Sequence, residues 1–293
     1  MTVQIVEPLV TGTERLTKPG AALPEKGPGM RHVGIDLRTA SCASRACGHA
    51  VRLYQGQALF MHPLGACLVR CLVLTFCLLS ATATAAERYV RAGATGSGSG
   101  ADWTNACPGF TGTCAVGNLA RGDTYYIADG SYGSMTLARA TSGTAAITFR
   151  KATASDHGTD VGWSSAYGDG QASFGTIFAV TDYWTFDGQV RDENNWSDTG
   201  AYGFRLSEVV ANTINHGTGS SHMTFRYVDV GGPASTSYNA GNPDHGFYLG
   251  GFGSVLSHWV ITRSHVHNVN RIPFQLAGAS NIVIEYSWIG PNW

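Results

Sequence analysis

A short β-pattern that recurs three times between residues 221 and 293 constrains this chain more than any other feature. The copies begin at His222, His258 and Asn281, and each alternates apolar and polar residues before closing on an aliphatic one. The last two copies begin 23 residues apart, and the two before them 36 residues apart. Short strands at this period, without helical periodicity, predict a stacked coil with a loop inserted in the longer interval.

A second short motif accompanies the repeat. It reads Gly203-Phe204-Arg205-Leu206, Gly246-Phe247-Tyr248-Leu249 and Pro273-Phe274-Gln275-Leu276. A strand of three or four residues cannot bury a face alone, whereas stacked coils bury continuous inner columns. We therefore expect Phe204, Phe247 and Phe274 to form one column. The other predicted inward columns are Leu206/Leu249/Leu276, Met223/Trp259/Ile282, Phe225/Ile261/Ile284 and Val230/Val266/Ile289.

These residues resemble the right-handed parallel β-helix shared by pectate-lyase-like proteins, and the resemblance covers residues 88–293. It implies an all-β solenoid, with Gly122–Tyr132 as an opening coil and a short N-terminal cap beginning near Asp102. We expect a single β-helix domain over residues 86–293. Because Trp293 follows a strand copy directly, we also expect this domain to be incomplete. The resemblance specifies the fold far better than the activity.

The first 85 residues differ in character from the rest of the chain. They hold eight Lys and Arg against four Asp and Glu, whereas residues 86–293 hold eleven against sixteen. Residues 61–85 have a positive Arg70, an apolar run and the small-residue sequence Ala83-Thr84-Ala85, which predicts a secretory signal peptide. Residues 1–60 lack hydrophobic periodicity, so we expect disorder or a mis-assigned start upstream of Met61.

Cysteine usage supports export. Five of the seven cysteines precede residue 86, which leaves Cys107 and Cys114 in the mature chain. An even number of cysteines in an exported chain predicts a disulfide that closes the short loop between them. We expect a secreted or extracytoplasmic protein, with no membrane span after the signal is removed.

Outward positions of a stacked coil also form columns, because adjacent turns lie about 4.8 Å apart. The predicted outward columns are Asp187/Arg226/Thr262/Glu285, Asp229/His265/Trp288, and Arg205/Tyr248/Gln275 flanked by Asp244 and Arg271. Charged and aromatic groups on a continuous face suit a sugar chain that lies across several coils. The predicted substrate-binding residues are Arg205, Arg226, Asp229, Asp244, Glu285 and Trp288.

A lyase reaction would use a different subset of these side chains. Elimination from a uronic acid needs a base for the proton α to the carboxylate and a cation for the enolate-like charge. The predicted catalytic residues are His245 or His265 as base, Tyr248 as acid and Arg271 or Arg263 as carboxylate neutraliser, and His267 belongs to the same group. His222 and His258, by contrast, stand where the third copy has Asn281, which predicts turn residues.

The resemblance to known enzymes is incomplete. Some β-helix lyases use a lysine base, but residues 86–293 contain one lysine, Lys151, in an early coil. Pectate lyases gather Asp and Glu around Ca²⁺, and the sequence shows no tight acidic cluster. Asn242-Pro243-Asp244-His245 is similar to the Asp-Pro-His motif of mannuronan epimerases, in a different order. The sequence therefore assigns no metal ligand and leaves the cofactor open, with Ca²⁺ as one candidate.

We predict a secreted carbohydrate-active protein, and a polysaccharide lyase that acts on an acidic polysaccharide as its first functional hypothesis. One alternative is a non-catalytic surface or adhesion protein that binds glycan. The other is a glycoside hydrolase that uses two carboxylates, Asp229 or Asp244 with Glu285. The acidic mature region predicts no nucleic-acid binding, and we expect a monomer.

Overall fold

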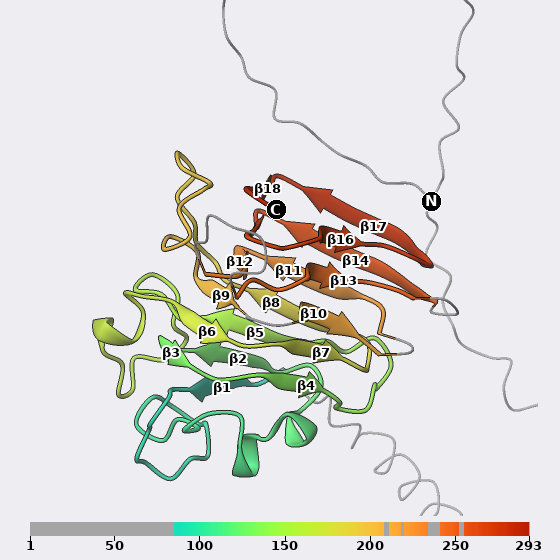
Figure 1. The fold of residues 1–293 in the computed structure, drawn as a ribbon. Helices are drawn as coiled ribbons and strands as arrows, with labels where there is room; N and C mark the ends of the chain where they lie inside the picture. Colours follow the sequence, from blue (N-terminus) through green and yellow to red (C-terminus); the bar gives the residue numbers. More distant parts are fainter. Residues whose placement is uncertain (1–84, 208–210, 218–219, 234–240, 252–254, 293) are drawn as a thin grey trace, which may run out of the picture. The chain divides into compact units, whose positions relative to one another are not determined.

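The computed structural model describes residues 85–207, 211–217, 220–233, 241–251 and 255–292. The strands in these residues form three sheets in which every pairing is parallel, and successive strands pass from sheet A to sheet B to sheet C in each coil (Figure 1). This arrangement is the predicted right-handed parallel β-helix. Residues 1–60 and the predicted signal peptide, apart from Ala85, lie outside the described residues.

Each sheet takes one short strand from each coil. Sheet A contains β1 (Glu87–Val90), β2 (Thr124–Ile127), β5 (Ile147–Lys151), β8 (Trp184–Asp187), β11 (Met223–Arg226), β14 (Leu256–Thr262) and β17 (Ala279–Glu285). Sheet B contains β3 (Gly130–Ser131), β6 (Ala172–Phe174), β9 (Phe204–Leu206), β12 (Val228–Gly231), β15 (His265–His267) and β18 (Trp288–Ile289). Sheet C contains β4 (Met135–Leu137), β7 (Ile177–Ala179), β10 (Asn212–His216), β13 (His245–Tyr248) and β16 (Ile272–Gln275).

The alternation of side chains in each strand sets which ones enter the core. In β11, Met223 and Phe225 are fully buried, whereas Arg226 is exposed. The register aligns Met223 with Trp259 and Ile282, and Phe225 with Ile261 and Ile284, as the sequence predicted. It also confirms the Val230/Val266/Ile289 column of sheet B. Coils in register thus bury one continuous apolar interior.

The predicted column of Phe204, Phe247 and Phe274 is wrong. Phe204 lies in β9 of sheet B, opposite Val228, whereas Phe247 and Phe274 pair with each other in sheet C. Leu206 is likewise opposite Val230 and not above Leu249. The sheet C strand that precedes Phe247 is β10, in which Ile214 takes the inward position. All three phenylalanines still face one shared core.

Single residues in left-handed backbone turn the chain between sheets. On sheet A these residues are Tyr183 and His222, directly before β8 and β11, and His258 and Asn281, within β14 and β17, with φ of 61°, 56°, 59° and 52°. The turns after β11, β14 and β17 use Tyr227, Arg263 and Tyr286, with φ of 54°, 51° and 47°. The prediction of a turn residue is therefore confirmed for His222, whereas His258 has the same left-handed backbone but lies within strand β14. The rings of Tyr183, His222 and His258 stack in succession with centroids 4.5 Å apart. This stacking offsets part of the cost of left-handed backbone, about 1–2 kcal/mol for each residue.

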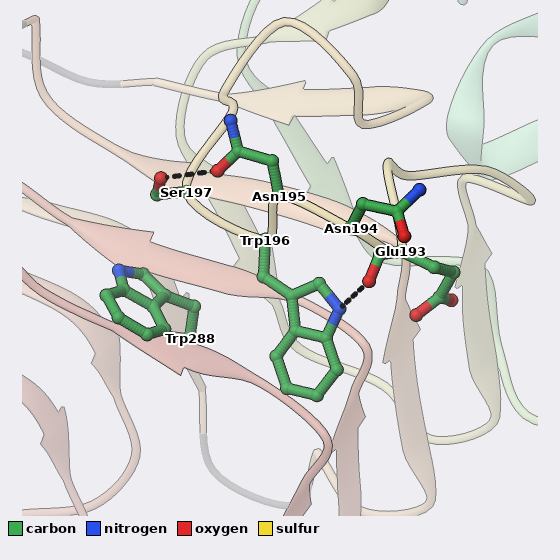
Figure 2. A pocket seen from close by; sticks show the side chains of 6 residues that line it. All are labelled: Glu193, Asn194, Asn195, Trp196, Ser197 and Trp288. Carbon is green, nitrogen blue, oxygen red and sulfur yellow. Dashed lines mark hydrogen bonds between the residues drawn. The ribbon is translucent and has the colours of Figure 1, made fainter.

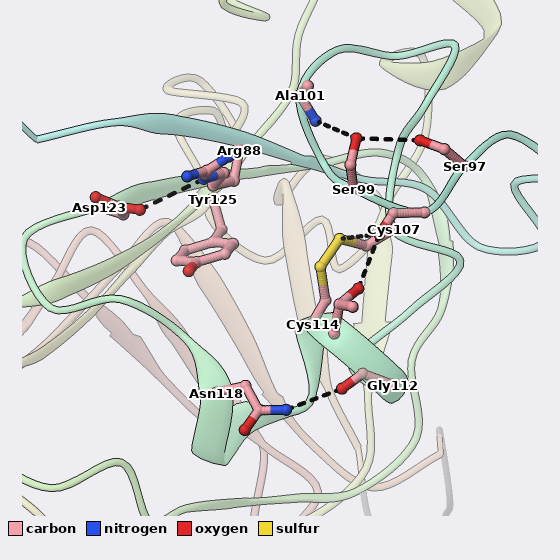
Figure 3. Close-up of a disulfide and its surroundings, with 12 residues drawn as sticks. Arg88, Ser97, Ser99, Ala101, Cys107, Gly112, Cys114, Asn118, Asp123 and Tyr125 are labelled. Carbon is pink, nitrogen blue, oxygen red and sulfur yellow. Dashed lines mark hydrogen bonds and ion pairs between the residues drawn. A yellow bond between two sulfur atoms is a disulfide. The ribbon is translucent and has the colours of Figure 1, made fainter.

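The segment between β1 and β2 packs against the first coils. It contains two 3₁₀ turns, η1 (Gly112–Cys114) and η2 (Val116–Asn118), and a third, η3 (Ser165–Tyr167), follows β5. The predicted disulfide joins Cys107 to Cys114 within this segment (Figure 3). Both cysteines belong to the main core, and Phe110 packs on Phe149 with ring centroids 4.9 Å apart. None of the described helices is long and apolar enough to cross a membrane.

Candidate functional site

A pocket lies between the loop that follows β8 and strand β18 of the last coil. It has a volume of about 330 Å³. Its lining consists of Glu193, Asn194, Asn195, Trp196, Ser197 and Trp288. Figure 2 shows the two indole groups below the polar side chains of Asn195 and Ser197. Two aromatic rings with several hydroxyl, amide and carboxylate groups are a combination that suits a polar ring-shaped ligand.

Arg191 holds this loop against coils that are distant in sequence. Its guanidinium carbon lies 4.0 Å from the centre of the Trp196 ring, and its Nη1 donates to the Tyr286 carbonyl oxygen at 2.5 Å. Its Nη2 also pairs with Glu193 Oε2 at 2.8 Å. The indole N–H of Trp196 donates to the Glu193 carbonyl at 3.1 Å. These contacts fix the Trp196 ring before any ligand arrives, which lowers the entropic cost of binding.

Glu193 is the one charged residue in the pocket lining. Hydrogen bonding from Arg191 lowers its pKa against the smaller opposing effect of burial, and Arg263, 3.2 Å from Oε1, lowers the pKa further. Glu193 is therefore ionised at neutral pH. An ionised carboxylate accepts hydrogen bonds, so it favours ligands with hydroxyl groups over ligands with carboxylates of their own.

The predicted column of Asp229, His265 and Trp288 is confirmed, and Arg205 stands one coil before it. Its members are not all accessible, however. Trp288 is 47% exposed, whereas Asp229 and His265 are 0% and 1% exposed. The Tyr202 ring stacks on His265 at 6.0 Å, and its hydroxyl donates to the Trp196 carbonyl at 2.7 Å. The pocket loop thus covers the outward face of this column.

Asp229 is the centre of a buried polar cluster. Its Oδ2 pairs with Arg205 Nη1 at 2.8 Å, and its Oδ1 lies 3.2 Å from His265 Nδ1 and 2.9 Å from His267 Nε2. Burial acts to raise the pKa of Asp229, but the two imidazoles and Arg205 outweigh it and hold the pKa below its usual range. The Asp229 carboxylate is therefore ionised although it is fully buried.

A second group of predicted residues gathers on sheet C. His245 is 4% exposed, and its Nδ1 lies 2.7 Å from Asn212 Oδ1. Its ring meets the Tyr248 ring edge to face at 5.2 Å. Burial lowers the pKa of His245, and the charge of Arg271 lowers it further. Because the amide oxygen only accepts, Nδ1 carries the proton, and Nε2 keeps a lone pair.

The structure separates several residues that the sequence analysis grouped. Arg205 lies on sheet B, whereas Tyr248 and Gln275 pair on sheet C, so that predicted column is wrong. His265 lies on sheet B and His245 on sheet C, so the two alternative bases occupy different faces. The Asp187/Arg226/Thr262/Glu285 column is confirmed on sheet A, where Arg226 pairs with Asp187 at 2.5 Å. Asp244 and Arg271 flank the sheet C group.

The sequence analysis missed Trp196 and Glu193. Both lie in a polar run after β8 that was not assigned to the site. A tryptophan in a stretch as polar as Asp192–Asp198 was the available signal, because an aromatic side chain there has no local apolar partner.

No protein-family model and no curated protein sequence matches the chain. Among solved structures, the chain is similar to the crystal structure of pectate lyase Pel9A, with a TM-score of 0.44 and 14% sequence identity. The alignment covers 68% of this chain and 47% of that one, so the chain spans about half the length of the protein it matches.

Proposed function

We propose that this β-helix binds a polysaccharide and that the Trp196–Trp288 pocket holds one of its sugar rings. The observation that carries the proposal is the pair of indoles beside Glu193, Asn194, Asn195 and Ser197. Aromatic faces pack against the apolar faces of sugar rings, while amide, hydroxyl and carboxylate groups bond the ring hydroxyls.

The charge of the pocket favours a neutral ring at this position. Arg191 and Arg263 both pair with Glu193 and neither lines the pocket, so Glu193 is the charged group that a ligand there would meet. A uronate ring placed in the pocket would bring a second carboxylate next to Glu193 without a cation in the lining. An acidic polysaccharide would therefore have to place its carboxylates outside this pocket.

Replacing Trp288 with alanine is expected to weaken glycan binding roughly 5- to 30-fold, because a half-exposed aromatic anchor contributes about 1–2 kcal/mol. Trp196→Ala is expected to have at least the same effect. Isothermal titration calorimetry with a panel of neutral and acidic oligosaccharides measures the affinity of both variants. Val161→Ala, on an exposed valine outside the pocket, is the control and should leave affinity unchanged. Unchanged affinity in both tryptophan variants would remove the pocket from the proposal.

Lyase activity on an acidic polysaccharide is the second candidate function, and the His245 geometry favours it. Asn212 fixes the tautomer that leaves Nε2 unprotonated, and the lowered pKa keeps the ring neutral at pH 7. Arg271 supplies a nearby cation, and Tyr248 a phenol. The Nε2 atom is buried, so it would reach a substrate proton only after a neighbouring side chain moves.

His245→Ala is expected to lower lyase turnover at least about 100-fold, since general-base catalysis contributes roughly 10²–10⁴. Because burial and Arg271 depress the pKa of His245, wild-type activity should persist below pH 6.5 and fall only at more acidic pH. The assay incubates pectin, alginate and chondroitin with the enzyme and records unsaturated-product absorbance and reducing ends separately. His258→Ala, at an exposed corner, is the matched control. Reducing ends without new absorbance would indicate a hydrolase, and neither signal would favour binding alone.

The disulfide and the predicted signal peptide support export of the protein. The disulfide between Cys107 and Cys114 is stable in an oxidising compartment, and residues 61–85 have the pattern of a signal peptide. We infer that the protein meets its polysaccharide outside the cytoplasm.

A further inference from the structure

The side chains of Asp229, His265 and His267 converge on one buried point. Asp229 lies on β12, and both histidines lie on β15 of the next coil, on the outward face of sheet B. Loop contacts cover them, so their side chains are only 0%, 2% and 3% exposed. Each offers one donor atom, and these three atoms all lie within 4.8 Å of one another.

The two contacts at this point are ion pairs only if the histidines are protonated. Asp229 Oδ1 lies 2.9 Å from His267 Nε2 and 3.2 Å from His265 Nδ1, yet none of the three atoms has a hydrogen-bond partner of acceptable geometry among the described residues. Buried polar atoms without partners are unfavourable. Three such atoms that face one another would all be satisfied by a cation bound between them.

The tautomer of His265 strengthens this conclusion. Its Nε2 lies 2.9 Å from the Gly290 carbonyl oxygen, which can only accept a hydrogen bond. Nε2 must therefore carry a proton, and in the neutral ring Nδ1 has the lone pair. That lone pair faces Asp229 Oδ1, 3.2 Å away, so two acceptor atoms meet with no hydrogen between them, an arrangement that a bound cation would stabilise. A metal-bound histidine commonly has this arrangement, with its other ring nitrogen donating to a carbonyl.

We propose that Asp229, His265 and His267 bind a first-row divalent transition-metal ion, for which Zn²⁺ is the probe. Tetrahedral Zn²⁺ with bonds of about 2.0–2.1 Å keeps its ligand atoms roughly 3.3 Å apart, close to the spacings at Asp229. Two imidazoles with one carboxylate suit Zn²⁺ or Fe²⁺, whereas Ca²⁺ takes oxygen ligands. Arg205 bonds the other carboxylate oxygen and fixes its orientation.

The packing around His267 leaves room for its ring and little else. The register places Gly231 of β12 opposite His267. A Cβ atom at Gly231 would lie 2.0 Å from the His267 carbonyl oxygen and 3.2 Å from its ring carbon Cδ2. The bound ion would join two successive coils directly beneath the loop that carries Tyr202 and Trp196. This inference does not depend on what the pocket binds.

Equilibrium dialysis of the full chain against Zn²⁺, after treatment with a chelator, tests the proposal. The wild-type protein should take up one zinc ion at this site. Asp229→Asn and His267→Gln should each weaken zinc binding at least about 10- to 100-fold, because even residues that only support metal ligands have effects of this size. His222→Gln is the matched control, because His222 is an exposed histidine in the turn before β11, stacked on a second histidine. Its uptake should equal that of the wild type.

Zinc-edge X-ray absorption of the wild-type protein provides a measurement that needs no variant to fold. Cysteines between residues 42 and 77 can take up zinc through sulfur, so the decisive signal is an ion with two imidazole ligands and no sulfur. The proposal is overturned if no such ion is found, or if both variants bind zinc as tightly as the wild type. If the protein takes up no zinc and its ¹⁵N NMR spectrum shows one buried imidazole protonated on both nitrogens, then a proton and not a metal ion lies between Asp229 and the histidines.

Discussion

Replacement of Phe225 with alanine is expected to lower the free energy of unfolding by about 3–5 kcal/mol. Phe225 is fully buried and lies in the middle of an aromatic stack. Its ring centre is 4.9 Å from that of Phe186 and 5.8 Å from that of Trp259, both nearly parallel to it, and Phe247 meets it edge to face at 5.5 Å. Because large rings on three sides cannot collapse into the space, a cavity would remain.

Urea denaturation followed by tryptophan fluorescence measures this loss. Thr224→Ala on the same strand is the control, because Thr224 points outward and such substitutions usually change stability by less than about 0.5 kcal/mol. A Phe225→Ala variant as stable as the control would mean that the stacked interior does not hold the coils together. The Trp196–Trp288 pocket would then lose its support, since its two sides come from different coils.

Replacement of Asp129 with asparagine is expected to cost about 3 kcal/mol at neutral pH. Lys151 occupies an inward position at the end of β5, with its side chain 1% exposed, and its Nζ lies 2.5 Å from Asp129 Oδ1. Without Asp129 the buried ammonium group would keep its hydrogen bond to the Ala152 carbonyl but lose its ion pair. We place the cost at the lower end of the range for buried pairs because the Asp129 side chain keeps 18% exposure. The double variant Asp129→Asn/Lys151→Met should recover most of the loss.

The pH dependence of this variant follows from the Lys151 pKa. Burial lowers that pKa from its ordinary value of 10.5, and Asp129 opposes the change. In Asp129→Asn the folded-state pKa falls further, so the unfolded state binds more protons between that pKa and 10.5. Stability therefore rises with pH across this window, and the deficit should be smaller at mildly alkaline pH than at neutral pH. A deficit that stays constant would show that charge on Lys151 is not its cause.

Sequence periodicity predicted the sheet A strands correctly, because their alternation is long and each copy ends on an aliphatic residue. Periodicity failed for Phe204. Its motif, Gly-Phe followed by a leucine two residues later, is compatible with a strand of sheet B and equally with a strand of sheet C. The preceding sheet C strand, Asn212–His216, has one apolar residue that marks it, Ile214, between polar neighbours. The strand with which β13 aligns, whether β9 or β10, depends on hydrogen-bond pairing between coils. The periodicity of a single sequence does not specify that pairing.

Prediction of the site was limited in a different way. Alternation correctly placed Asp229 and His265 on the outward side of their strands, but outward does not mean accessible when a loop from an earlier coil folds over them. The covering contacts of Tyr202 and Arg191 reach residues between 63 and 95 positions later in the chain. Contacts at that separation leave no periodic trace, so neither the Trp196 pocket nor the burial of the histidines was visible beforehand.

The junction between sheets A and B has a consequence for how such a protein can change over evolutionary time. After β11 the junction is the single residue Tyr227, whereas after β8 it is the whole segment 188–203. Pairing is kept on both sides of the longer segment, as Arg226 still aligns with Asp187 and Asp229 with Arg205. The segment that carries Glu193 and Trp196 can therefore vary in length and sequence during evolution, while the pairing of the coils beneath it is kept.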